Sequence, residues 1–392
     1  MSGAPETASA LGALWTFPAV LAAAFLLAWA AEASQFVVSQ GLALAALAWL
    51  QTMPEFSIEG VIAWQAGKGV FHPSLMTANF TGAIRLLVGL GWPMVFVVRA
   101  LHARPGLRGF FQAHVRLEEE HSVEVLAVLP PIAWFVAVLI KGSLTVVDAA
   151  VLLAMYAGYF WLVSRVPSRE REELDDLPRV SRWILTRPAG WKPAAAVAVF
   201  LGGGALLFVA AGPFVHSLQA LALVLGVPAF VFVQWVAPLL SEFPEKVSAF
   251  YWARTVHKAP MAMMNMLSSN INEWTVLAAV IPVVYSLSCG HPAPVVLDHQ
   301  QRLEIGLTLA QSVLGFLFLV NMEFRWYEAA GLFLLWLVQF VRPDSHVPVM
   351  AAYLAWSAVE LVLLMTGRHR WTAFQAFARE WRRYSAPRPG RA

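Results

Sequence analysis

Acidic side chains inside apolar segments are the most informative residues of this sequence. Glu55 follows Pro54 in GLALAALAWLQTMPEFSIEG, and Glu245 follows Pro244 in VQWVAPLLSEFPEKVSAF. Both stretches are long enough to lie in a bilayer, where an ionisable side chain is costly and usually serves an ion or proton pathway. Because each half of the chain carries one Pro-Glu pair, we expect a duplicated architecture with an ion site between the halves.

The two prolines predict where oxygen ligands gather. Pro54 and Pro244 lack an amide donor, so each should break its helix and leave carbonyl oxygens unpaired near mid-membrane. Carboxylate and carbonyl oxygens together suit hard cations such as Ca²⁺ or Na⁺. Thr52, Ser241 and Glu242 lie up to one turn before the glutamates and are expected to add oxygens from the same face.

A polar stripe follows about one helix later in each half. Residues 265–273 read NMLSSNINE, in which Ser269, Asn270 and Glu273 offer hydroxyl, amide and carboxylate groups at helical spacing. The matching stretch of the first half is poorer, and it offers Asn79 and then Arg85. We expect Arg85 to face Glu273 as a tethered cation, because each follows its Pro-Glu glutamate by a similar distance.

The candidate site is rich in acidic groups. Five glutamates fall within apolar segments, namely Glu55, Glu59, Glu242, Glu245 and Glu273. An uncompensated charge at mid-membrane costs roughly 3 kcal/mol, so five would cost about 15 kcal/mol in total. Bound cations, protons or a water-filled cavity must offset this cost. Glu59 lies one turn after Glu55, and Glu242 three residues before Glu245, so each pair could share protons in turn.

Composition and hydrophobic runs predict an all-α polytopic membrane protein. Hydrophobic residues make up 59% of the 392 residues and charged residues 13%. Counting about twenty apolar residues per crossing gives eleven spans, near 14–31, 36–66, 73–99, 122–141, 145–165, 194–212, 217–254, 260–288, 303–321, 323–341 and 347–367. Basic clusters at 99–116, 165–192 and 368–391 then share one side, which places the N-terminus outside and the C-terminus in the cytoplasm.

The helix order predicts two inverted repeats. Residues 1–165 form a first repeat of five helices, 166–193 a solvated cytoplasmic linker, and 194–341 a second repeat of five. Five is odd, so the second repeat inserts upside down and the two Pro-Glu helices run antiparallel. Residues 342–392 add one further transmembrane helix and a basic cytoplasmic tail.

Pro-Glu followed on the next helix by Asn-x-x-[Gly/Ser]-Ser-Asn resembles the alpha repeats of the sodium/calcium exchanger superfamily. The resemblance is best over 228–288, where Leu-Ser-Glu-Phe-Pro-Glu at 240–245 takes the place of Gly-Thr-Ser-x-Pro-Glu. It implies a ten-helix inverted-repeat core that extrudes calcium against sodium or protons. It also implies metal ligation by Glu55, Glu245 and Glu273. Neither Gly-Thr-Ser is intact in this chain.

We therefore expect a secondary active cation antiporter that works by alternating access, and not an enzyme. The expected partners are the lipid bilayer and inorganic cations, with Ca²⁺, Na⁺ or H⁺ as transported ions, no cofactor and no nucleic acid. The expected location is a bacterial inner (plasma) membrane, and no oligomeric state follows. Two alternatives stay open: a sodium/proton or other cation/proton exchanger that has lost calcium, and a non-transporting membrane protein that kept the fold.

Overall fold

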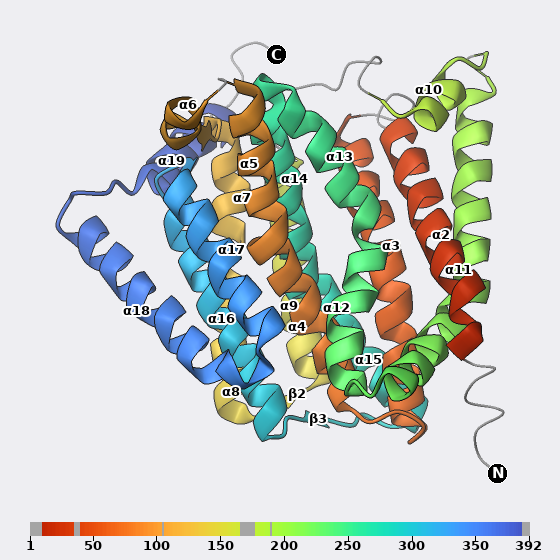
Figure 1. The fold of residues 1–392 in the computed structure, drawn as a ribbon. Helices are drawn as coiled ribbons and strands as arrows, with labels where there is room; N and C mark the ends of the chain where they lie inside the picture. Colours follow the sequence, from red (N-terminus) through yellow and green to blue (C-terminus); the bar gives the residue numbers. More distant parts are fainter. Residues whose placement is uncertain (1–9, 35–39, 104–105, 165–176, 189, 386–392) are drawn as a thin grey trace.

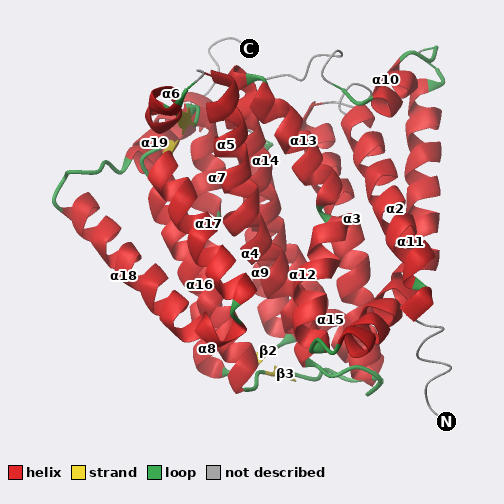
Figure 2. Cartoon of the chain, in the orientation of Figure 1, coloured by secondary structure: helices red, strands yellow, loops and turns green. Residues whose placement is uncertain are grey.

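The computed structural model describes residues 10–34, 40–103, 106–164, 177–188 and 190–385, and of residues 40–51 and 384–385 the backbone alone. Helices dominate the described residues (Figure 2). The first half contains α2 (Ala13–Ser34), α3 (Gln40–Gly67), α4 (Ser74–Leu86), α5 (Trp92–Ala103), α6 (Leu107–Gln112), α7 (Ser122–Ala127), α8 (Leu129–Lys141) and α9 (Val146–Val163). The second half contains α10 (Arg179–Leu185), α11 (Lys192–Leu225), α12 (Ala229–Ser241), α13 (Phe243–Arg254), α14 (Ala259–Asn272), α15 (Ala278–Cys289), α16 (His299–Leu319), α17 (Trp326–Val341), α18 (His346–Met365) and α19 (Thr372–Ser385).

These helices form eleven passages within the described residues, which run side by side between two ends of the molecule (Figure 1). Consecutive helices α4 and α5, α7 and α8, α12 and α13, and α14 and α15 each make one passage. Eight of the passages are long and apolar enough to cross a membrane, while α12 and α17 are shorter apolar helices. The all-α polytopic fold expected from the sequence is confirmed.

The predicted boundary between the sixth and seventh spans is wrong. We expected a break between residues 212 and 217, but α11 continues through Pro213 and ends at Leu225. Gly226 terminates it with φ 67°, a left-handed conformation that glycine adopts without strain. Pro228, which cannot continue a helix, then precedes α12.

The small β-strands reveal how the halves are related. β1 (His114–Arg116) and β2 (Ser143–Leu144) belong to the first half, and β3 (Val295–Val296) and β4 (Glu323–Arg325) to the second. β1 pairs antiparallel with β4, and β2 pairs antiparallel with β3. The earlier strand of each half thus pairs with the later strand of the other. Two repeats of opposite orientation give this pattern, since their equivalent loops lie at opposite ends.

Two π-helical turns, one in each half, give a second sign of duplication. A π-helical turn follows α4 at Leu87–Gly91, and another of the same length follows α14 at Glu273–Leu277. Such turns are rare and often mark functional sites. Their recurrence aligns the two repeats so that Leu87 corresponds to Glu273. We call this alignment the repeat register.

A close approach between α4 and α12 brings the two repeats into direct contact. A Cβ atom on Gly82 would lie 1.8 Å from the carbonyl oxygen of Gln234, so only glycine fits there. Nearby, Trp274 and Phe135 stack edge to face with ring centroids 4.7 Å apart. The core beside the π-helical turn is therefore tightly packed.

The linker expected to be solvated is packed in its second part. Residues 165–176 lie outside the described part of the chain, but Leu177, Ile184 and Leu185 are buried, and Ser181 donates hydrogen bonds to α2. Apolar residues at helical spacing in α10 favour burial over a free hinge.

The two ends of the structure give a topology test. α10 and α19 lie at one end, and the chain's N-terminal side of α2 lies at the other (Figure 1). Arg187→Cys and Arg382→Cys, each in a Cys289→Ser background, should both react with an impermeant thiol reagent from the cytoplasmic side only, because basic loops stay in the cytoplasm. Reaction of the two variants from opposite sides would contradict the fold.

Candidate functional site

Three glutamates from three different helical segments meet in the interior. One carboxylate oxygen from each of Glu55 on α3, Glu242 at the α12–α13 junction and Glu273 on the π-helical turn lie within 4.8 Å of one another. All three side chains are buried. At an effective dielectric constant near 20, two unit charges at this separation repel by about 3 kcal/mol. Either a cation balances the charge of these carboxylates, or some of them are protonated.

Several polar atoms beside this cluster have no hydrogen-bond partner among the described residues. They are Glu55 Oε1, Glu242 Oε1, both oxygens of Glu273, and both the oxygen and nitrogen of the Asn270 amide. Buried polar atoms normally find partners, so a group of unpartnered oxygens indicates a ligand-binding position. Asn270 lies three residues before Glu273, on the same face of the helix.

The α12–α13 junction explains why Glu242 reaches the cluster. α12 ends at Ser241 and α13 begins at Phe243, with Pro244 at its second residue. Proline near a helix start needs no amide partner, so the sequence permits a break here. The break that we also predicted at Pro54 is wrong, because α3 continues through Pro54. Glu242 occupies the break and turns its carboxylate into the interior.

Lys246 brings a positive charge into the same region. Its ammonium forms an ion pair with Glu242 Oε2, and its side chain is only 7% exposed. Glu245 and Glu273 are its other charged neighbours. Lys246 was not among the residues predicted for the site, although its position one residue after Glu245 could have drawn attention to it.

Glu245 and Glu59 each face an asparagine of the following helix. Asn265 donates to Glu245 Oε1 at 3.3 Å, and Ser269 donates to the same oxygen. In the first repeat, Asn79 donates to Glu59 Oε2 at 2.8 Å. Both asparagines follow their glutamates by 20 residues. Glu59 and Glu245 are therefore structural counterparts.

This finding corrects the equivalence that we drew between the two Pro-Glu pairs. The repeat register maps Glu59 onto Glu245 and Asn79 onto Asn265, in agreement with their hydrogen bonds. It places Glu55 opposite Ser241. Glu55 thus lies one turn earlier in its repeat than Glu245 does in the other, and Glu242 takes the place in the cluster that we had assigned to Glu245.

The expectation that Arg85 faces Glu273 is wrong. Its guanidinium is fully buried and donates to Glu304 Oε2 at 2.6 Å and to Gln339 Oε1 at 3.0 Å. Its Nε donates to the carbonyl oxygen of Thr81 at 3.2 Å. In the repeat register, Arg85 corresponds to Ile271 and not to Glu273. The arginine therefore points to the opposite face of its helix, away from the stripe that carries the cation ligands.

The Arg85–Glu304 pair belongs to a second buried polar network. Gln234 donates to Glu304 at 3.1 Å, and His346 Nδ1 lies 3.1 Å from the other oxygen of Glu304. The network joins α4, α12, α16, α17 and α18. Each of the three guanidinium nitrogens donates one hydrogen bond, and the buried charge is paired with Glu304, which is typical of a structural ion pair.

The remaining predicted ligands lie close to the cluster but bond elsewhere or only locally. Ser241 donates its hydroxyl to the carbonyl oxygen of Ala237 at 3.0 Å, within its own helix. Thr52 is buried on α3, three residues before Glu55. Ser269 supports Glu245 instead of reaching the three-carboxylate cluster.

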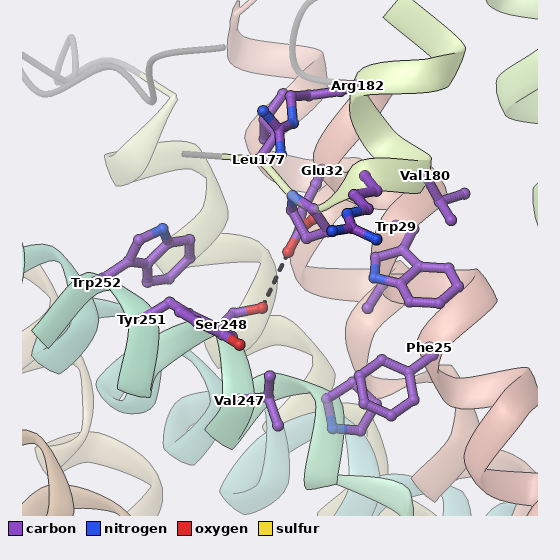
Figure 3. Close-up of a pocket in the computed structure, with 14 residues that line it drawn as sticks. Phe25, Trp29, Glu32, Leu177, Val180, Arg182, Val247, Ser248, Tyr251 and Trp252 are labelled. Atoms are coloured by element: carbon purple, nitrogen blue, oxygen red, sulfur yellow. Dashed lines mark hydrogen bonds between the residues drawn. The ribbon is translucent and has the colours of Figure 1, made fainter. Parts of the chain in front are cut away.

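A cavity of about 620 Å³ approaches the α12–α13 junction from the end that carries α10 (Figure 3). It is lined by residues of α2, α10 and α13, including Trp29, Ser248 and Pro244. Glu32 accepts hydrogen bonds from Ser181 and Ser248, each at 3.0 Å. The lining residue Pro244 directly precedes Glu245 in the sequence.

Comparison with known proteins identifies the family. Residues 8–165 and 195–342 match the family described as sodium/calcium exchanger protein. The chain belongs to this family. It is thus a cation/Ca²⁺ exchanger by family and not an enzyme, and the two matched segments agree with the two inverted repeats and the additional C-terminal helix.

Solved structures of other exchangers share the fold. The H⁺/Ca²⁺ exchanger CAX is 28% identical over 96% of this chain and 91% of its own, with a TM-score of 0.85. The sodium-calcium exchanger NCX_Mj is 17% identical, covers 86% of this chain and 98% of its own, and gives a TM-score of 0.51. YfkE is 14% identical, covers 90% of this chain and 98% of its own, and gives a TM-score of 0.55. No protein of curated function matches the chain.

Proposed function

We propose that this exchanger moves Ca²⁺ across the membrane in exchange for H⁺, with the cation held by Glu55, Glu242 and Glu273. The observation that supports this most strongly is the meeting of three buried carboxylates with unpartnered oxygens. Oxygen ligands of this kind suit Ca²⁺, which accepts six to eight of them in flexible geometry. Asn270 would add an amide oxygen.

The same carboxylates can take up the counter-ion. When Ca²⁺ leaves, their mutual repulsion favours protonation of part of the cluster, so that protons and Ca²⁺ compete for the same oxygens. The 28% identity to an H⁺/Ca²⁺ exchanger over almost the whole chain favours protons as the driving ion. The proposal includes no resident cofactor, since all the ions are substrates.

Sodium exchange is the second candidate. NCX_Mj shares the fold, but its 17% identity says nothing about the driving ion of this chain. Arg85 gives no reason to exclude Ca²⁺ from the site, because its charge is paired with Glu304 outside the three-carboxylate cluster. A non-transporting protein would have little use for the unpartnered oxygens of Glu273.

Alternating access follows from the two inverted repeats. We infer that the cavity between α2, α10 and α13 is one of the two aqueous entrances, because Pro244, which directly precedes Glu245, is among its lining residues. Half-buried Val247 and Ser248 line it. The opposite entrance would open when the repeats rock against each other.

This entrance is testable by chemical modification. Val247→Cys in a Cys289→Ser background should react with a small impermeant thiol reagent, and the reaction should stop Ca²⁺ flux because the adduct fills the cavity. Val209→Cys on the exposed face of α11 is the matched control and should keep its flux after treatment. Full flux from modified Val247→Cys would contradict the assignment of the entrance.

The driving ion is tested in sealed vesicles that contain the purified protein. With sodium absent, an acid-inside pH gradient should drive Ca²⁺ uptake and alkalinise the lumen as protons leave. A sodium gradient at equal pH should drive none. The reverse pattern would establish sodium as the counter-ion, and no uptake under either gradient would favour a non-transporting protein.

A further inference from the structure

Lys246 is an unusual component of a cation site. Its ammonium is buried, pairs with Glu242 Oε2 and has Glu245 and Glu273 as further charged neighbours. A positive charge in this place repels any cation that approaches the same carboxylates. Its presence calls for a role beyond simple neutralisation, since a glutamine at position 242 would remove the charge with less desolvation.

The two oxygens of the Glu242 carboxylate have different surroundings, and this difference points to that role. Oε2 faces the ammonium, while Oε1 has no hydrogen-bond partner among the residues that the structure describes. Lys246 follows Glu242 by four residues, so it spans the α12–α13 break and holds the carboxylate across it. One oxygen is thus fixed, and the other remains available to Glu55 and Glu273.

Only the second repeat carries this charge. The repeat register places Gly60 opposite Lys246, and a Cβ atom at Gly60 would meet no atom within 4 Å. Space therefore does not explain the difference between the repeats. The first repeat has a glycine at the position where the second has a lysine. The two repeats therefore contribute one fixed positive charge at this pair of positions.

We infer that Lys246 is a built-in monovalent cation of the exchange site: it occupies the position beside Glu242 that a mobile monovalent ion could otherwise fill, and it weakens the hold of the site on Ca²⁺ enough for release. This inference rests on the proposed function. Weaker ground-state binding raises turnover when release of the ion limits the cycle. Lys246 is accordingly a specificity-determining residue and not a cation ligand.

The inference predicts a split between affinity and turnover. Lys246→Met should lower the KM and the Kd for Ca²⁺ at least tenfold and lower the maximal flux, because the ion leaves more slowly. Lys246→Arg keeps the charge and should stay within about threefold of the wild type. Lys246→Met/Glu242→Gln restores the net charge, keeps one oxygen ligand, and should return the Kd towards the wild-type value.

Chemical rescue separates charge from packing. Lys246→Ala leaves room for a small amine, so ethylammonium at millimolar concentration should restore maximal flux, while ethanol of similar size should not. We would measure Ca²⁺ binding by calorimetry in detergent and Ca²⁺ flux in vesicles for every variant, with choline as the only monovalent cation apart from the added ethylammonium.

The outcomes are distinguishable. If Lys246→Met and Lys246→Arg both weaken Ca²⁺ binding alike, or if ethanol rescues as well as ethylammonium, Lys246 has a packing role and the inference is overturned. If Lys246 variants match the wild type in Kd and flux, it is also overturned, while the proposed function stands. If the wild-type protein neither binds nor transports Ca²⁺, the proposed function fails and takes this inference with it.

Discussion

Glu273→Gln is expected to reduce Ca²⁺ uptake by about a hundredfold or more at low Ca²⁺. The substitution removes one of three clustered carboxylates and keeps its volume. Loss of one charged partner from a buried polar site typically costs about 2–5 kcal/mol, and about 2.8 kcal/mol corresponds to a hundredfold loss of affinity. Uptake by the purified variant in vesicles, measured against Ca²⁺ concentration, gives the KM and the maximal rate.

The melting temperature, measured with and without Ca²⁺, distinguishes loss of the cation site from misfolding of the variant. In Ca²⁺-free buffer Glu273→Gln should melt at the same temperature as the wild type or higher, because it relieves repulsion from Glu55 and Glu242. Added Ca²⁺ should raise the melting temperature of the wild type but not that of the variant. Glu119→Gln, which changes an exposed glutamate near α7, is the matched control and should behave as the wild type. Wild-type uptake by Glu273→Gln would exclude this residue from the cation site.

Arg85→Met is expected to destabilise the protein by about 3–5 kcal/mol, because it leaves the buried Glu304 charge without its partner. It also removes the donor to Gln339. Breaking one side of a buried ion pair usually has this cost, whereas replacing both partners by apolar residues is often nearly neutral. Arg85→Met/Glu304→Leu should therefore recover most of the loss. Unfolding by denaturant in detergent micelles measures both variants.

A second substitution of Arg85 tests whether the arginine contributes to stability or to the ion pathway. Arg85→Lys keeps the charge but loses the fork that contacts Glu304 and Gln339, so it should lose part of the stability. Its Kd for Ca²⁺ should equal the wild-type value, because the guanidinium lies outside the three-carboxylate cluster. An altered Kd with unchanged stability would instead place Arg85 in the ion pathway.

Much of the fold could be predicted because bilayer thickness fixes the length of each apolar run. The eleven passages, the odd number of helices per repeat and the opposite orientation of the repeats follow from that constraint and from the basic loops. The polar stripe at 265–273 was also visible, because polar side chains at helical spacing in an apolar segment have few structural uses. Glu55 and Glu273 do meet as expected.

The register between the repeats could not be read from the dipeptides alone. The two Pro-Glu pairs suggested that Glu55 corresponds to Glu245, but the π-helical turns and the Asn79–Glu59 bond give that place to Glu59. The two alignments differ by about one helical turn, so the wrong one kept the expected helix faces. This is why Glu245 was predicted as a metal ligand, while Glu242 was predicted to share protons with it as Glu59 does with Glu55.

Long-range pairing explains the wrong prediction for Arg85. Arg85 and Glu304 are 219 residues apart, and no local pattern shows that one will neutralise the other. Lys246 escaped notice because a lysine near a helix end can equally extend towards the membrane surface. Which of these directions a long side chain takes depends on the packing of other helices around it.

A structure determined by anomalous diffraction from crystals soaked in Ca²⁺ tests the central claim most directly. The account predicts one strong peak between Glu55, Glu242 and Glu273, with carboxylate oxygens about 2.3–2.6 Å away, and no such peak in crystals of Glu273→Gln. A peak beside Glu59 and Asn79, or no interior peak in an active wild-type protein at saturating Ca²⁺, would contradict it.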